Sequence, residues 1–171
     1  MCYFLYIASP LTLSEVRSML PPGASADLAE IGDQQVLKSV LPDAQTVARL
    51  LVGRCSCDFV RHRQEETRED ERHLRERYRR LETPRTLTIP SLERHRRGGG
   101  IRTPREGWPR ALAGFVAEHS RNAGPTLYHL HFSPGPPSLG PVGSIREVGL
   151  PEVIARPESW LQEDVSALVS R

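Results

Sequence analysis

Three cysteines are the residues of this chain whose types and spacing point to chemistry: Cys2, Cys55 and Cys57. The last two form a Cys-x-Cys inside the run Leu-Leu-Val-Gly-Arg-Cys-Ser-Cys-Asp-Phe-Val. Side chains two apart on a strand point to the same face, so these thiols are expected to converge on one object. Zinc and copper(I) prefer soft thiolate ligands. The pattern therefore predicts a transition-metal site, which Cys2 joins if the first strand lies beside the second.

His129 and His131 repeat this spacing on a later predicted strand. Zinc also accepts imidazole, and a structural zinc site takes four such ligands. A Cys3His or Cys2His2 site is available if the three strands are neighbours and their faces match. Two alternatives stay open. The cysteines fit small buried thiols in a β core, and the histidines fit rings that hydrogen-bond to backbone or carboxylate groups.

Cys2 also fits a catalytic role. Removal of Met1 would leave an N-terminal cysteine whose own amine can act as base, as in N-terminal nucleophile hydrolases. The opening Met-Cys, the aromatic-rich strand and the following Leu-rich helix start resemble the beginning of class II glutamine amidotransferases. This resemblance implies a hydrolase and ends there, because the Asn-Gly and Gly-Asp elements of that family are missing. The sequence does not decide whether the protein is an enzyme.

A broader likeness covers about half of the chain. A Met-Cys-x-Phe start, a Cys-x-Cys that closes a strand and a later Gly-x-x-Leu-x-His strand resemble small uncharacterised bacterial proteins. The matching pieces here are Cys2, Cys55, Cys57 and residues 124–131. The resemblance implies a bacterial protein and no particular activity.

The elements that must position these side chains follow from hydrophobic patterning. One helix is predicted to begin at the capping-box spacing Thr12-Leu-Ser-Glu15 and to run to residue 20. A second is predicted to begin at Trp108 and to stop at Asn122-Ala-Gly124. A third is predicted over 158–169. Strands are predicted over 2–8, 47–57 and 126–132, with an edge strand over 148–155. The order indicates one domain over 1–171 with an α+β or α/β fold, in which helices pack on a small mixed sheet. A ferredoxin-like arrangement is favoured.

Two stretches depart from this regular pattern. Residues 24–45 are ambiguous, and the segments Ala-Asp-Leu-Ala-Glu and Gln-Gln-Val-Leu-Lys-Ser-Val-Leu both fit short helices. Residues 61–106 are rich in arginine and poor in large apolar groups, which predicts a charged insertion with a helix over 64–82 and a flexible part after it.

The insertion supports a competing function, an interaction protein that docks a protein partner or RNA. The residues that would bind the partner are Arg94, Arg96, Arg97 and Arg102, within a segment that resembles an RGG tract in composition. Acidic residues are interleaved with the arginines, which favours a solvated charged helix instead.

Bulk composition excludes several classes. The 171 residues carry a formal net charge of +2, which argues against a nucleic-acid or membrane partner. No run reaches the ~18 apolar residues of a transmembrane helix, and residues 2–8 are too short for a signal peptide. We therefore expect a cytoplasmic protein with reduced thiols. The sequence has no P-loop and no GxGxxG, so it gives no support to a nucleotide cofactor. The cofactor expected from the cysteines is zinc or copper, or else none.

Overall fold

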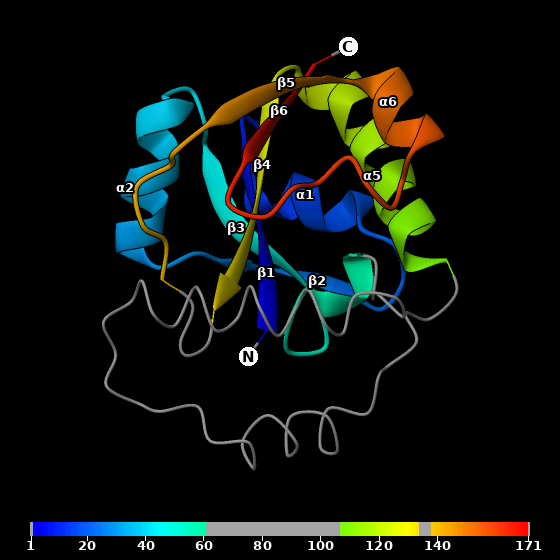
Figure 1. Ribbon diagram of the computed structural model, residues 1–171, viewed down its shortest axis with the longest axis horizontal. Helices are drawn as coiled ribbons and strands as arrows, with labels where there is room; N and C mark the ends of the chain where they lie inside the picture. The colour runs from blue at the N-terminus through cyan, green and yellow to red at the C-terminus, as the bar shows by residue number, and fades with distance from the viewer. Residues whose placement is uncertain (1, 61–106, 134–137, 171) are drawn as a thin grey trace, which may run out of the picture. The chain divides into compact units, whose positions relative to one another are not determined.

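The computed structural model describes residues 2–60, 107–133 and 138–170 (Figure 1). Its strands are β1 (Cys2–Ser9), β2 (Ala24–Leu28), β3 (Thr46–Val52), β4 (Thr126–Ser133), β5 (Ile145–Gly149) and β6 (Ser166–Ser170). Its helices are α1 (Leu13–Met19), α2 (Ile31–Val40), α5 (Trp108–Ala123) and α6 (Leu150–Ala155), with a 3-10 turn η1 (Cys57–Phe59). Helices packed on a mixed sheet confirm the predicted α+β class.

The strands form one sheet with the order β2-β3-β1-β4-β6-β5. Only the β5–β6 pair is parallel among the described strands, and the other four pairs are antiparallel. Strand β1 lies in the centre, where it is hydrogen-bonded to β3 on one side and β4 on the other. The strands predicted to carry the cysteines and histidines are therefore neighbours. A ferredoxin-like arrangement is not confirmed by this six-stranded sheet.

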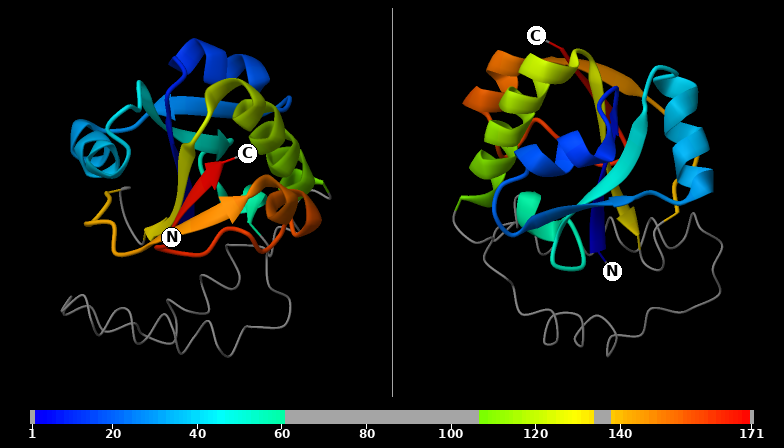
Figure 2. Two further views of the ribbon diagram at one scale, coloured as in Figure 1. Left: turned by 90° about the horizontal axis from the view of Figure 1, so that it is seen from above. Right: turned by 180° about the vertical axis from the view of Figure 1, so that it is seen from behind.

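Helices lie on both faces of the sheet (Figure 2), and each face has its own hydrophobic core. Leu5 and Ile7 of β1 face the larger core, which is completed by apolar side chains from α1, α5 and α6 such as Val16, Leu112 and Val153. Tyr6 and Ala8 face the smaller core, which α2 covers together with Leu139. Burial on both faces explains why β1 is apolar without alternation.

Two predicted helices form as their end signals indicate. Thr12 and Glu15 close the capping box of α1, since the Thr12 side chain accepts from the Glu15 N–H and the Glu15 side chain accepts from the Thr12 N–H. Helix α5 has a proline in its first turn and ends at Gly124, whose φ of 76° favours glycine.

Two segments near the C-terminus were predicted wrongly. Residues 148–155 are not a strand throughout, because β5 ends at Gly149 and Pro151 falls in the first turn of α6. Residues 158–169 are not a helix, because the chain from Ser166 pairs with β4 and β5. Long-range pairing that buries both faces of β6 outweighs the local helical spacing.

The ambiguous stretch 24–45 contains one helix and not two. Residues 31–40 form α2, whereas 24–28 form the edge strand β2, which pairs with β3. The expected helix over 64–82, the flexible part of the insertion and the four arginines Arg94, Arg96, Arg97 and Arg102 lie outside the described residues. The partner-docking function stays a prediction.

Candidate metal centre

The Cys-x-Cys lies just beyond β3 and not on it, which corrects the predicted strand over 47–57. Strand β3 ends at Val52, and the chain then turns at Gly53, where a φ of +70° favours glycine. Cys55 follows as an antiparallel bridge partner of Val52, and its carbonyl accepts from the Val52 N–H at 2.8 Å. Cys57 then begins η1. The two thiols converge through a tight turn and a 3-10 helix.

Three hydrogen bonds fix the turn against β1, and a fourth ties it to β3. The Ser56 N–H donates to the Tyr3 carbonyl at 2.8 Å, and the Leu5 N–H donates to Oγ of Ser56 at 2.7 Å. Oγ of Ser56 donates in turn to the Leu50 carbonyl at 2.5 Å. The Tyr3 N–H donates to Sγ of Cys57 at 3.4 Å. Residues 55–57 thus lie beside the N-terminal half of β1, next to Cys2.

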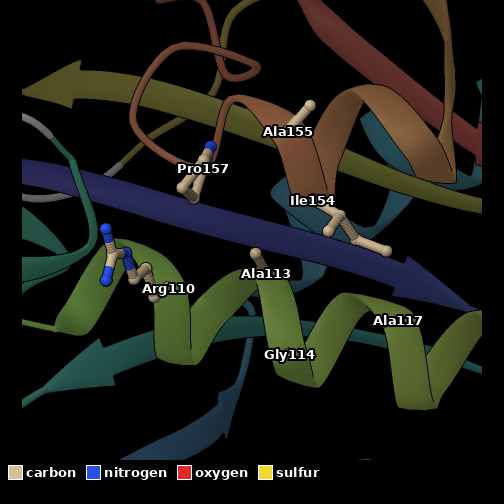
Figure 3. A pocket seen from close by; sticks show the side chains of 7 residues that line it. All are labelled: Arg110, Ala113, Gly114, Ala117, Ile154, Ala155 and Pro157. Atoms are coloured by element: carbon tan, nitrogen blue, oxygen red, sulfur yellow. The ribbon is translucent and has the colours of Figure 1, made fainter.

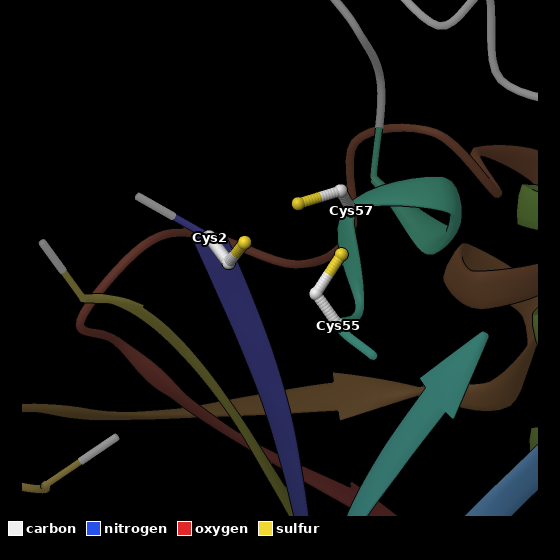
Figure 4. Close-up of side chains that lie close together, drawn as sticks. All are labelled: Cys2, Cys55 and Cys57. Carbon is white, nitrogen blue, oxygen red and sulfur yellow. The ribbon is translucent and has the colours of Figure 1, made fainter. Parts of the chain in front are cut away.

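The sulfurs of Cys2, Cys55 and Cys57 all lie within 4.8 Å of one another, and we call this set the cysteine cluster. Figure 4 shows the three side chains turned toward a common space, one from β1 and two from the turn. All three thiols are free, and each residue is partly exposed. The predicted convergence of the three cysteines is confirmed.

Burial favours the protonated form of the Cys2 and Cys57 thiols. It raises the pKa of Cys57 to about 12, against the opposing effect of the Tyr3 N–H that donates to its sulfur. The pKa of Cys2 is also raised, first by burial and next by the nearby Cys55. Adjacent thiolates in a partly buried site repel one another, so they need a bound cation to form together.

The geometry suits a thiophilic ion. A tetrahedral zinc centre with Zn–S bonds of about 2.3 Å separates its sulfurs by about 3.8 Å, so the cluster needs only a small contraction. Copper(I) is softer than zinc and also prefers thiolate ligands. Three sulfurs leave a fourth position of a tetrahedral ion for another group.

The predicted histidine ligands lie on β4 as expected but not with the sulfurs. Among the described residues, no ring nitrogen joins the cysteine cluster in a common group. His129 and His131 instead form a second group with Asp164, in which one atom of each residue lies within 4.8 Å of the others. Burial lowers the pKa of His129.

Sequence reasoning missed Asp164 and Ser56. Asp164 lies in an exposed turn before β6, and its place beside His131 depends on a strand that was predicted as a helix. Ser56 was passed over as the central residue of the Cys-x-Cys. Its small polar side chain between two cysteines was the one available signal, and it is fully buried.

A groove elsewhere on the molecule has little chemistry in it. It lies between α5 and α6 and is lined mainly by small or apolar residues, including Ala113, Gly114 and Ile154, with Arg110 at one end (Figure 3). It contains no ligand for a soft metal ion and no nucleophile.

Comparison of the chain with protein-family models, with curated proteins and with solved structures finds no match. In the part of the chain that the structure describes, no helix is long and apolar enough to cross a membrane. The two resemblances noted from the sequence are untested, and so is the catalytic role of Cys2. The cysteine cluster is therefore the feature of the described residues that points to a function.

Proposed function

We propose that this protein binds one thiophilic transition-metal ion, zinc or copper(I), through the thiolates of Cys2, Cys55 and Cys57. The observation that carries the proposal is the approach of all three sulfurs to within 4.8 Å. These are all the cysteines of the chain, and they come from segments more than fifty positions apart.

Partial exposure favours a metal site over inert core thiols. A cysteine that only fills space in a core is usually fully buried. Each cysteine of the cluster is instead of intermediate exposure, although β1 and β3 beside it contain fully buried residues such as Leu5 and Leu50. An ion can therefore reach the sulfurs from solvent, and a fourth ligand has room to approach.

The hydrogen bond from the Tyr3 N–H to Cys57 provides second support. Such a bond stabilises a thiolate more than a thiol, and it orients the sulfur for a ligand role. The buried Ser56 holds the turn in place before any ion binds. A site that exists in the folded protein binds with less ordering cost than one that the ion must assemble.

The test compares zinc binding by the untagged full-length protein with that of Cys2→Ser, Cys55→Ser and Cys57→Ser. Competition with a chromophoric chelator gives affinity, and circular dichroism verifies the fold of each variant. We expect each substitution to weaken binding at least tenfold, since it removes one of three charged ligands. Ser39→Cys serves as control, because it adds a thiol on the exposed side of α2, away from the cluster. Its zinc stoichiometry should equal that of wild type. Full stoichiometry and affinity in folded Cys55→Ser and Cys57→Ser would refute the proposal.

A further inference from the structure

His129, His131 and Asp164 form a second group of potential ligands that the cysteine cluster does not use. The two histidines come from β4, and their rings lie nearly parallel, with an interplanar angle of 17° and a centroid separation of 6.4 Å. Asp164 comes from the turn that precedes β6. One nitrogen of each ring and one oxygen of Asp164 lie within 4.8 Å of one another.

The backbone holds Asp164 in this position. Its N–H donates to the carbonyl of Leu130, the residue between the two histidines, at 2.8 Å. Its φ of 57° lies in the left-handed region, which aspartate tolerates better than most residues. The carboxylate is thereby kept beside His131, where Oδ1 of Asp164 lies 2.9 Å from Nδ1.

Each ring has a defined way to present a nitrogen. Nδ1 of His129 is hydrogen-bonded to Oγ of Ser166 at 2.9 Å, and this bond orients the ring. Nδ1 of His131 lies 2.9 Å from Oδ1 of Asp164, so these two atoms already stand close together. A metal ion with bonds of about 2.1 Å to a nitrogen and an oxygen at a right angle separates those atoms by about 3 Å. An ion can therefore bind both atoms with little movement of the side chains.

We propose that His129, His131 and Asp164 form a second metal site, separate from the cysteine cluster, for a divalent first-row transition cation. Two imidazoles and one carboxylate are a ligand set that zinc, iron(II) and manganese(II) accept and that copper(I) does not prefer. The two sites differ in ligand chemistry: zinc suits both, whereas copper(I) suits only the cysteine cluster.

The solvent exposure of His131 and Asp164 favours a ligand role for this group over a purely structural ion pair. The side chain of His131 is 19% exposed and that of Asp164 is 46% exposed, whereas His129 is buried. One side of the group is therefore accessible to an ion and to water molecules that complete its coordination. An exposed ion pair of this kind contributes little to stability by itself.

Cobalt(II) is the probe that separates the two sites, because sulfur ligands give an intense charge-transfer band in the near ultraviolet and nitrogen and oxygen ligands do not. Equilibrium dialysis of the full-length reduced protein should show two bound equivalents. His129→Gln, His131→Gln and Asp164→Asn should each lose one equivalent, or weaken it at least tenfold, with the sulfur band unchanged. Asparagine is the chosen replacement because it also tolerates the left-handed φ of residue 164.

His119→Gln is the matched control. His119 is also buried, but Oγ of Ser9 and Oγ1 of Thr126 lie near its two ring nitrogens, at 2.9 Å and 3.3 Å. This variant should keep both equivalents.

The outcomes for the two sites are distinguishable. A bound equivalent that lacks the sulfur band and is lost in His131→Gln supports the second site, even if the band itself is absent and the cysteine proposal fails. A sulfur band with one equivalent only, insensitive to His131→Gln and Asp164→Asn, overturns the second site and leaves the cysteine proposal standing.

Discussion

The main-chain N–H of Tyr3 donates to Sγ of Cys57 at 3.4 Å, so the central strand of the sheet contacts the cysteine cluster directly. The neighbouring carbonyl of Tyr3 accepts from Ser56 at 2.8 Å. Both polar groups of one β1 residue are thereby used to hold the Cys-x-Cys turn. The geometry of the cluster is therefore tied to a central strand of the sheet, and changes to either should affect the other.

Ser56→Ala should weaken zinc binding although it leaves all three thiols in place. The change removes the acceptor of the Leu5 N–H and the donor to the Leu50 carbonyl, both buried. We expect a loss of about 2 kcal/mol in the free energy of unfolding, measured by urea titration, and weaker zinc binding by chelator competition. Ser18→Ala, on the exposed side of α1, should change either quantity little. Zinc affinity equal to wild type in Ser56→Ala would show that the turn does not need this support.

Zinc should stabilise the folded protein through the cluster. An ion that binds the folded chain raises the free energy of unfolding by about 2.7 kcal/mol when its free concentration is a hundred times Kd. Calorimetric melting of the reduced protein with and without zinc measures this effect. The shift in Tm should be smaller in Cys57→Ser than in the Ser39→Cys control. An equal shift in both variants would mean that zinc acts elsewhere.

The buried carboxylate of Asp33 should contribute strongly to stability. It accepts from the Tyr6 hydroxyl at 3.0 Å and from the Leu139 N–H at 2.8 Å, which joins α2, β1 and the segment before β5. Asp33→Asn turns one acceptor into a donor that faces another donor. We therefore expect the free energy of unfolding to fall by about 2 kcal/mol. Tyr6→Phe should cost less, because it removes only one hydrogen bond.

Asp43→Asn, at an exposed position of the turn after α2, is the control for Asp33→Asn in denaturant unfolding. The two variants should differ clearly in the denaturant concentration at the midpoint. Indistinguishable midpoints would contradict the role assigned to Asp33.

Acid should destabilise the protein through His119. Burial lowers its pKa to about 4, whereas the unfolded chain titrates near the usual 6.5. Between these values the unfolded state binds the proton and the folded state does not. The contribution of the neutral His119 to the free energy of unfolding is fully present above pH 6.5. It is lost as the pH falls toward 4, by about 3 kcal/mol at most. Burial also lowers the pKa of His129, so this residue too lowers the free energy of unfolding as the pH falls.

Urea unfolding at several pH values, compared between wild type and His119→Gln, measures this effect. The variant should lose less stability than wild type between pH 6.5 and pH 4. Parallel pH profiles for the two proteins would contradict the assignment to His119.

The parts of the fold predicted correctly have strong local signals. The apolar run of β1, the capping box at Thr12 and the stop at Gly124 each act within a few residues. Strand β6 has no such signal, because its apolar residues fit a helix and only pairing with β4 and β5 decides its state. Strand β2 was ambiguous because Ala24 and Ala26 are too small to reveal an alternating pattern.

The candidate site was predictable in its ligands and not in its geometry. Cysteines two apart predicted convergence, but the turn at Gly53 that produces it replaces the expected strand. The histidines are separated from Cys2 by the β1–β4 register, which pairs His131 with Phe4 and His129 with Tyr6. Their hydrogen-bond partners Ser166 and Asp164 reach β4 only through the unexpected strand β6 and the turn before it. Long-range register of this kind is not contained in local patterns.

The metal content of the wild-type protein tests the central claim most directly. The full-length chain is purified without a histidine tag under reducing conditions, and its metals are measured by elemental mass spectrometry beside a count of accessible thiols. We predict zinc or copper at a ratio of about one or more per chain, with cysteine thiols that react only after the metal is removed. Natively folded protein that holds no metal after exposure to zinc and copper(I), and whose three thiols titrate freely, would contradict the account.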